Sequence, residues 1–109
     1  MGVITIESEE EFDQALEDAG NKLVVVDFWA EWCGPCRMIG PHFHRWSNDS
    51  AFKDVVFLKI DVDELSDLAE KIGISCMPTF IFFRHGKKKE ELSGANKDML
   101  RAKIEELKK

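Results

Sequence analysis

The spacing of hydrophobic positions changes along this sequence, and the changes mark the predicted strands and helices. Short apolar runs rich in β-branched and aromatic residues are typical of strands. Four such runs are Val3–Ile6, Leu23–Trp29, Val55–Ile60 and Thr79–Phe83, and Lys88–Leu92 adds an edge strand protected by lysines. The run at 23–29 is apolar at nearly every position, which predicts a central strand covered on both faces.

Between these runs, apolar residues recur every three or four positions and predict helices. The helical stripes are Phe12, Ala15, Leu16 and Ala19; Met38, Ile39, Phe43 and Trp46; Leu65, Leu68, Ala69 and Ile72; and Leu100, Ile104 and Leu107. Ser8 and Glu11 have the spacing of a capping box, and Asn96 is placed to cap the last helix. Pro41 lies inside the second helix and is expected to kink it, because proline lacks a backbone donor.

The resulting order, β-α-β-α-β-α-β-β-α, predicts an α/β fold. Alternating strands and helices place helices on both faces of a sheet, and a hairpin around Gly86 makes that sheet mixed. The sequence has 109 residues, of which 44% are hydrophobic, and this is enough for one packed domain over residues 1–109.

The charge and the ends of the sequence narrow the function classes. A net charge of −6 argues against nucleic acid or an anionic membrane as the main partner, since both attract basic surfaces. The apolar run at 23–26 is too short to cross a bilayer. The first residues turn acidic at once and lack the pattern of a signal peptide, so we expect a cytoplasmic protein. Thiols stay reduced there, and a Cys-x-x-Cys pair indicates redox chemistry or metal ligation.

Such a pair, Cys33 and Cys36, stands where the buried strand ends and a helix begins. Free backbone N–H groups and the positive end of the helix dipole favour a thiolate at that place. We expect Cys33 to be the more exposed and more acidic nucleophile, with Cys36 shielded one turn behind it. Pro35 suits the first turn, where a missing N–H costs little. The predicted reaction is attack by Cys33 on a client disulfide, followed by attack of Cys36 on the mixed disulfide.

Asp27 is a carboxylate in the valine-rich strand that leads to the cysteines. Burial should raise its pKa far enough for it to accept a proton near neutral pH, so we interpret Asp27 as the base that activates Cys36 through a water molecule. Lys59 lies on the next apolar strand and is placed to pair with Asp27. The alternative is therefore a purely structural buried ion pair.

Plainer interpretations stay open for several residues. A zinc site completed by Cys76 and one of the three histidines would also explain the cysteine pair, although the usual second pair of ligands is missing. Two inert core thiols are a further alternative. We assign no role to His42 and His44. Trp29 is expected in the core, and Trp32 at the rim of a client-binding surface.

Taken together, these residues resemble the thioredoxin family, over essentially the whole chain. The matching segments are Val26–Ala30, Trp32–Cys36, Arg37–Ile39, Pro41, Asp61–Asp63, Met77–Phe80, Gly86 and Ser93–Lys97. The resemblance implies a thioredoxin fold, in which four helices flank a central mixed sheet, and a general protein-disulfide reductase.

The resemblance also implies partners and site residues. Thioredoxin reductase would supply electrons from NADPH, no cofactor would be bound, and the clients would be disulfide-containing proteins such as peroxiredoxins and reductases. By this resemblance, such electron transport would serve cell redox homeostasis. The family motif makes Cys33 the nucleophile, Cys36 the resolving thiol and Asp27 the buried acid, with a cis proline in the loop facing them. The client groove would be lined by Trp32, Gly34, Pro35, Met77, Pro78, Gly94 and Ala95.

Two residues match different branches of the family, since Cys76 is similar to animal cytosolic members and Lys59 to bacterial ones. Cys76 is either a small half-buried thiol or a regulatory site that links two otherwise monomeric copies or takes up glutathione. The rival functions are a thioredoxin-like clamp subunit that does not need its cysteines and a disulfide isomerase or oxidase. The Gly34-Pro35 dipeptide counts against the second rival, whose members usually carry histidine between the cysteines.

Overall fold

The computed structural model describes residues 2–109 and contains a five-stranded sheet flanked by helices. The strands are β1 (Val3–Thr5), β2 (Leu23–Trp29), β3 (Val55–Asp61), β4 (Thr79–Arg84) and β5 (Lys87–Ser93). The helices are α1 (Glu9–Asp18), α2 (Gly34–Ser47), α3 (Ser66–Ile72) and α4 (Lys97–Leu107), with a short 3-10 helix, η1 (Ser50–Phe52). The predicted order of strands and helices is confirmed, and η1 is an addition to it.

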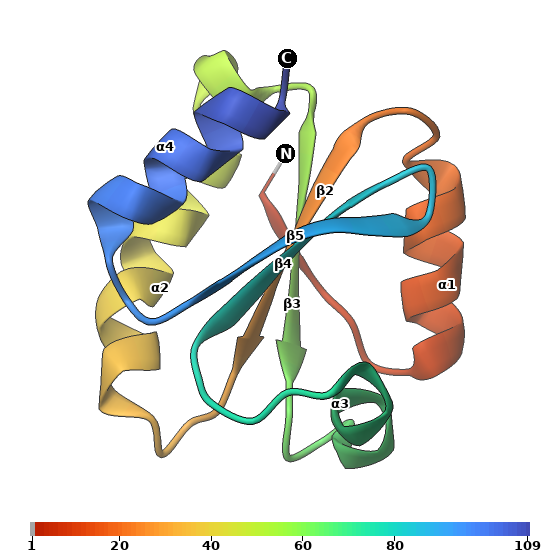
Figure 1. Ribbon diagram of the computed structural model, residues 1–109, viewed down its shortest axis with the longest axis vertical. Helices are drawn as coiled ribbons and strands as arrows, with labels where there is room; N and C mark the ends of the chain where they lie inside the picture. Colours follow the sequence, from red (N-terminus) through yellow and green to blue (C-terminus); the bar gives the residue numbers. More distant parts are fainter. Residues whose placement is uncertain (1) are drawn as a thin grey trace.

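The sheet is mixed, with the strand order β1-β3-β2-β4-β5. Strand β3 runs parallel to both β1 and β2, whereas β4 runs antiparallel to β2 and to β5. Helices α1 and α3 cover one face of this sheet, and α2 and α4 cover the other (Figure 1). The predicted α/β fold with helices on both faces is therefore confirmed.

Strand β2 is central and buried on both faces, as its apolar run predicts. Its side chains alternate between two hydrophobic clusters, because successive residues of a strand point to opposite faces. Leu23 and Val25 pack with residues of α2 and α4, while Val24, Val26 and Phe28 pack with residues of α1 and α3. The alternation directs the side chain of residue 27 toward the face that α2 covers.

Side-chain caps fix the starts of two helices. The Ser8 hydroxyl accepts a hydrogen bond from the backbone N–H of Glu11 at 3.1 Å, which is half of the predicted capping box. The other half differs, since the Glu11 carboxylate accepts from the N–H of Glu7, one residue before the cap. Asn96 caps α4 as predicted, because its side-chain oxygen accepts from the N–H of Met99 at 3.0 Å.

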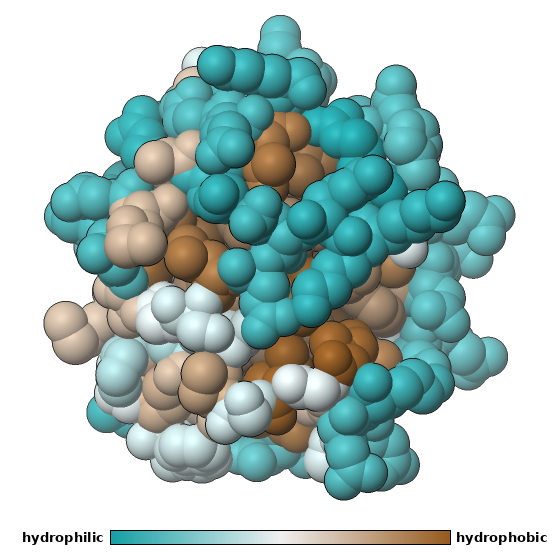
Figure 2. Space-filling model, viewed as in Figure 1, coloured by the Kyte–Doolittle hydropathy of each residue, from teal (hydrophilic) through white to brown (hydrophobic). Residues whose placement is uncertain are grey.

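The surface of the edge strand β5 is polar. Lys87, Lys88 and Lys89 are exposed, and hydrophilic side chains spread across the face of the molecule shown in Figure 2, with smaller apolar areas between them. Charged side chains on an edge strand discourage pairing with another chain, as expected for this segment. Within residues 2–109, no helix has the length and apolar character needed to cross a membrane.

Candidate active site

Cys33 and Cys36 lie at the junction between the end of β2 and the start of α2. Their sulfur atoms form a disulfide, and their Cα atoms are 5.3 Å apart. A spacing of three residues across the first turn of a helix brings the two side chains to the same face, as the sequence predicts. The pair therefore exists here in its oxidised form.

Cys33 is the N-cap residue of α2. Its sulfur accepts a hydrogen bond from the backbone N–H of Cys36 at 3.2 Å, and Pro35 lies in the first turn of the helix. The same N–H and the positive end of the helix dipole would stabilise a thiolate on Cys33 after reduction. This hydrogen bond gives a geometric reason for Cys33, rather than Cys36, to be the nucleophile.

Both cysteines are nearly covered by their surroundings. Cys33 is 5% exposed and Cys36 is 3% exposed, so the expected contrast in exposure is small. The reason is packing, because Ala30, Trp29 and Met77 lie against the disulfide. Little of either cysteine is therefore in contact with solvent in the oxidised form.

Asp27 is buried in the middle of β2, with 4% of its surface exposed. Burial raises the pKa of its carboxyl group from 3.8 to about 7, and the positive charge of Lys59 opposes part of this rise. Within residues 2–109, no group is hydrogen-bonded to the Asp27 Oδ1 atom. A carboxyl group with this pKa exchanges its proton near neutral pH, which is the property required of the predicted base.

Lys59 is the register partner of Asp27 on β3, so the two side chains are neighbours across the strands. The Lys59 ammonium lies over the ring of Trp29, 4.9 Å from the ring centroid. Lys59 therefore acts on Asp27 through its charge while it also makes a cation–π contact. Trp29 is half-buried beside the disulfide, close to its predicted place in the core.

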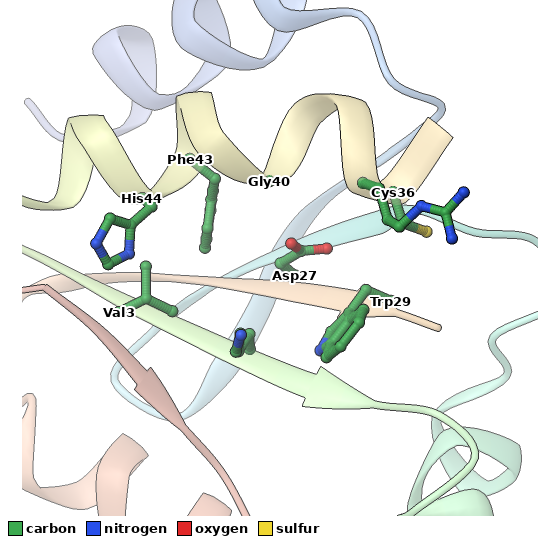
Figure 3. Close-up of a pocket in the computed structure, with 9 residues that line it drawn as sticks. Val3, Asp27, Trp29, Cys36, Gly40, Phe43 and His44 are labelled. Carbon is green, nitrogen blue, oxygen red and sulfur yellow. The ribbon is translucent and has the colours of Figure 1, made fainter. Parts of the chain in front are cut away.

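A cavity of about 170 Å³ joins Asp27 to Cys36. Its lining residues are Val3, Asp27, Trp29, Cys36, Arg37, Gly40, Phe43, His44 and Lys59. In Figure 3, the Asp27 carboxylate lies between Cys36 at one end of the group and the ring of His44 at the other. The volume is sufficient for several water molecules, since one occupies about 30 Å³ in the liquid. The sequence predicts the proximity of Asp27 and Cys36 but gives no sign of His44.

The predicted client groove begins at Trp32, whose side chain is 65% exposed. The Trp32 indole N–H donates a hydrogen bond to Asp63 at 2.8 Å, which fixes the ring beside the cysteines. Asp63 was not among the predicted site residues. Asp63 follows a predicted strand, but exposed aspartates are common at such positions. Its position is therefore only a weak sequence signal for a site residue.

The loop before β4 faces the same region. The Met77–Pro78 peptide bond is cis, as the family resemblance implies, and Met77 packs against the disulfide. The backbone N–H of Gly94 donates to the carbonyl of Pro78 at 2.9 Å, and Ala95 beside it is exposed. Gly94 has a φ of 97°, a conformation that favours glycine. A backbone hydrogen bond thus joins two of the three segments in which the groove residues were predicted.

Cys76 is an exposed free thiol just before this loop. The interpretation of Cys76 as a half-buried residue is therefore wrong, because its side chain does not enter the core. Within residues 2–109, no three His, Cys, Asp or Glu side chains are grouped so that they could hold a metal ion. The zinc alternative has no set of ligands in this part of the chain.

Comparisons with a family model, with curated relatives and with solved structures all indicate the same family. The thioredoxin family model matches residues 3–106. The chain is 54% identical over 102 residues to the thioredoxins of Oryctolagus cuniculus and Homo sapiens, covering 94% of this chain and 95% of each relative. Among solved structures, Malassezia sympodialis thioredoxin has a TM-score of 0.91 and 45% identity, covering 100% of this chain and 96% of that one. A poplar wild-type thioredoxin h has a TM-score of 0.92 and 40% identity, with 98% and 96% covered.

Proposed function

The chain belongs to the thioredoxin family, and on this premise we propose which of its residues carry out each step of its reaction. It is a thiol–disulfide oxidoreductase that reduces disulfides in client proteins. Members of this family carry no bound cofactor, so the electron pair resides in the two cysteines. The hydrogen bond from the Cys36 N–H to the Cys33 sulfur is the observation that carries the assignment of roles.

In the first step, the Cys33 thiolate attacks one sulfur of a client disulfide. A bond forms between Cys33 and that sulfur, and the other client sulfur leaves as a thiolate. The N-terminus of α2 lowers the free energy of the attacking anion, because Cys33 caps the helix. The product is a mixed disulfide between Cys33 and the client.

In the second step, Cys36 loses its proton and attacks Cys33. Asp27 accepts that proton through water in the shared cavity, a role supported by its pKa of about 7. The disulfide between Cys33 and Cys36 forms, and the client leaves as a thiolate that takes a proton from solvent. Lys59 supports this step by keeping the pKa of Asp27 from rising further.

The client segment binds in an extended form over the groove that was predicted from the sequence. Its lining residues are Trp32, Gly34, Pro35, Met77, Pro78, Gly94 and Ala95. Backbone pairing with an extended segment gives broad specificity, since it does not depend on the client side chains. The hydrogen bonds of Trp32 to Asp63 and of Gly94 to Pro78 support a preformed surface.

The family generally works with thioredoxin reductase and disulfide-containing clients. For this chain, we place the activity in the cytoplasm, in a single domain over residues 1–109, with peroxiredoxins and other reductases among the clients. The protein is a monomer that forms a dimer through Cys76 under oxidation, a proposal supported by the exposure of that thiol. A Cys76→Ser variant that still forms the same covalent dimer would contradict it.

A redox titration against dithiothreitol, followed by tryptophan fluorescence, tests the reductase directly, because Trp29 and Trp32 lie near the disulfide. We expect one reversible two-electron transition near about −270 mV, a general value for thioredoxins rather than a result of this geometry. A potential roughly 90 mV less negative would instead match the isomerases. Absence of a transition would overturn the proposed roles of both cysteines.

A Cys33→Ser, Cys36→Ser variant separates the reductase from a clamp subunit. We expect the variant to lose all reduction of a disulfide protein such as insulin, whereas a clamp would keep its function. The matched control is Cys76→Ser, which leaves the helix cap of α2 intact and should keep full activity with fresh reductant.

A further inference from the structure

The Asp27 cavity reaches the surface at His44. Asp27 and Cys36 are both buried, whereas His44 lines the same cavity and is exposed to solvent. In Figure 3 the imidazole ring stands at the end of the cavity opposite Cys36, with Asp27 between them. His44 is therefore the lining residue that combines contact with solvent and access to the cavity at the end away from the client.

The resolving step requires a route by which a proton can pass from the buried Asp27 to solvent. Each turnover transfers one proton from Cys36 to Asp27, and Asp27 must lose it before it can act again. A client bound over the groove covers the cysteine side of the cavity. The proton must then leave through the opposite end, where α2 passes over β1 and β3.

The side chains around the cavity differ in their ability to pass a proton. Within the described chain, four ionisable side chains besides Cys36 line it: Asp27 from β2, Lys59 from β3, and Arg37 and His44 from α2. Strand β1 contributes the uncharged Val3. Arginine and lysine normally keep their protons near neutral pH, while histidine both accepts and donates one there.

We propose that His44 transfers protons between Asp27 and solvent during the resolving step, through water in the cavity. The proposal rests on the role of Asp27 in the proposed function and extends it to the exit of the proton. The Asp27 carboxyl group gives its proton to one imidazole nitrogen by way of water, and the other nitrogen releases a proton to solvent. No electrons move in this transfer. His44 does not touch the reacting sulfurs, so it is an accessory residue that acts through Asp27.

A His44→Asn variant tests the proposal in a reaction with an aromatic disulfide, dithiobis(nitrobenzoate), followed by stopped flow in weak buffer near neutral pH. The first nitrothiobenzoate released reports attack by Cys33, and the second reports resolution by Cys36. Because the pKa of Asp27 is about 7, a large share of Asp27 carries a proton when the reaction begins and must lose it before it can accept the proton of Cys36. We therefore expect the second release to slow by roughly tenfold, less than the loss typical of a direct acid–base group. The first release should be unchanged, because it needs no proton from the cavity.

His42→Asn is the matched control on the same helix. The His42 ring contacts Arg45 and Trp46 instead of the cavity, so this variant should keep both rates. Imidazole added to the buffer should restore the second release in His44→Asn, since a small base can replace the missing side chain. A structural defect would not respond to imidazole.

A double variant, His44→Asn with Asp27→Asn, distinguishes failure of the His44 proposal from failure of the proposed role of Asp27. We expect His44→Asn to cause no further slowing in the Asp27→Asn background, because both changes interrupt the same proton transfer. A normal second release in His44→Asn, or a slow one that imidazole does not restore, would overturn the relay alone. A normal second release in Asp27→Asn would overturn the base role of Asp27 itself.

Discussion

At the scale of single residues, Asp27 is in an environment that opposes its charge. It occupies a position in β2 whose neighbours on the same face, Val25 and Trp29, are largely apolar. A structural ion pair would normally lower the pKa of a carboxyl group, whereas the pKa of Asp27 is raised because desolvation outweighs the attraction of Lys59. Strong perturbation of this kind, beside a disulfide, is more typical of a functional group than of a stabilising one.

The Asp27→Asn variant should be more stable than the wild-type protein above neutral pH. The folded pKa of about 7 lies above the ordinary value of 3.8, so the folded state binds more protons between these values. The contribution of Asp27 to the free energy of unfolding is therefore greatest below about pH 4, and it is lost as the pH rises through about 7. The difference of about three units corresponds to at most about 4 kcal/mol. Urea unfolding of both proteins across this range measures it.

Asp54→Asn is the control for this prediction, because Asp54 is an exposed aspartate in the turn before β3. Its stability should follow the pH dependence of the wild-type protein. A parallel pH dependence for Asp27→Asn and the wild type would show that Asp27 has an ordinary pKa, and the argument for the base would then fail.

Replacement of Lys59 should change the titration of Asp27 in a defined direction. The Lys59 charge lowers the pKa of Asp27, so Lys59→Met should raise that pKa above about 7. Lys59→Arg keeps the charge and should leave the pKa near its original value. Carbon NMR of the Asp27 carboxyl group in the reduced and oxidised proteins measures both. An unchanged or lower pKa in Lys59→Met would contradict the electrostatic coupling.

At the scale of elements, the sequence predicts the features that depend on local pattern. The run at 23–29 predicts β2 with the bounds that the structure shows, because a strand buried on both faces needs apolar residues at nearly every position. Ser8 and Asn96 predict two helix starts for a similar reason, since a cap is a contact between residues three apart.

Very short elements and contacts between residues far apart in the sequence cannot be predicted from the hydrophobic pattern. The helix η1 has only three residues, too few for a periodic stripe. His44 lines the Asp27 cavity because α2 passes over β2 and β3, and that crossing is invisible in a linear sequence. The cis bond before Pro78 came from the family resemblance, since few X-Pro bonds are cis and no local residue marks them. The sequence thus locates the cysteines and Asp27 but not the cavity between them and solvent.

The capping contact of α1 gives a prediction about stability alone. Ser8→Ala removes the acceptor for the Glu11 N–H and should destabilise the protein by about 1 kcal/mol, without changing disulfide reduction. Ser66→Ala is the control, because Ser66 follows Leu65, whose apolar side chain holds the N-cap position of α3. The control should stay within about 0.5 kcal/mol of wild type. Chemical unfolding measures both, and equal losses would argue against a specific cap.

At the scale of the whole molecule, the fold and the redox centre are separable. Two hydrophobic clusters lie on opposite faces of the sheet and draw on all four helices. The disulfide lies in a third, smaller cluster at the end of β2. Because the disulfide lies outside the two large clusters, breaking it leaves the packing contacts of those clusters in place.

Reduction of the disulfide should therefore lower stability while preserving the fold. The bond joins residues only three apart, and closing so short a loop stabilises the protein by about 2 kcal/mol, less than a bond across a long loop would. The urea midpoint of the reduced protein should be lower by on the order of 1 M, with the same slope. The Cys33→Ser, Cys36→Ser variant should have the urea midpoint of the reduced protein, and added reductant should not change that midpoint. Loss of cooperative unfolding on reduction would show instead that the two large clusters depend on the disulfide, and the reduced state would then be unable to serve as a preformed electron donor.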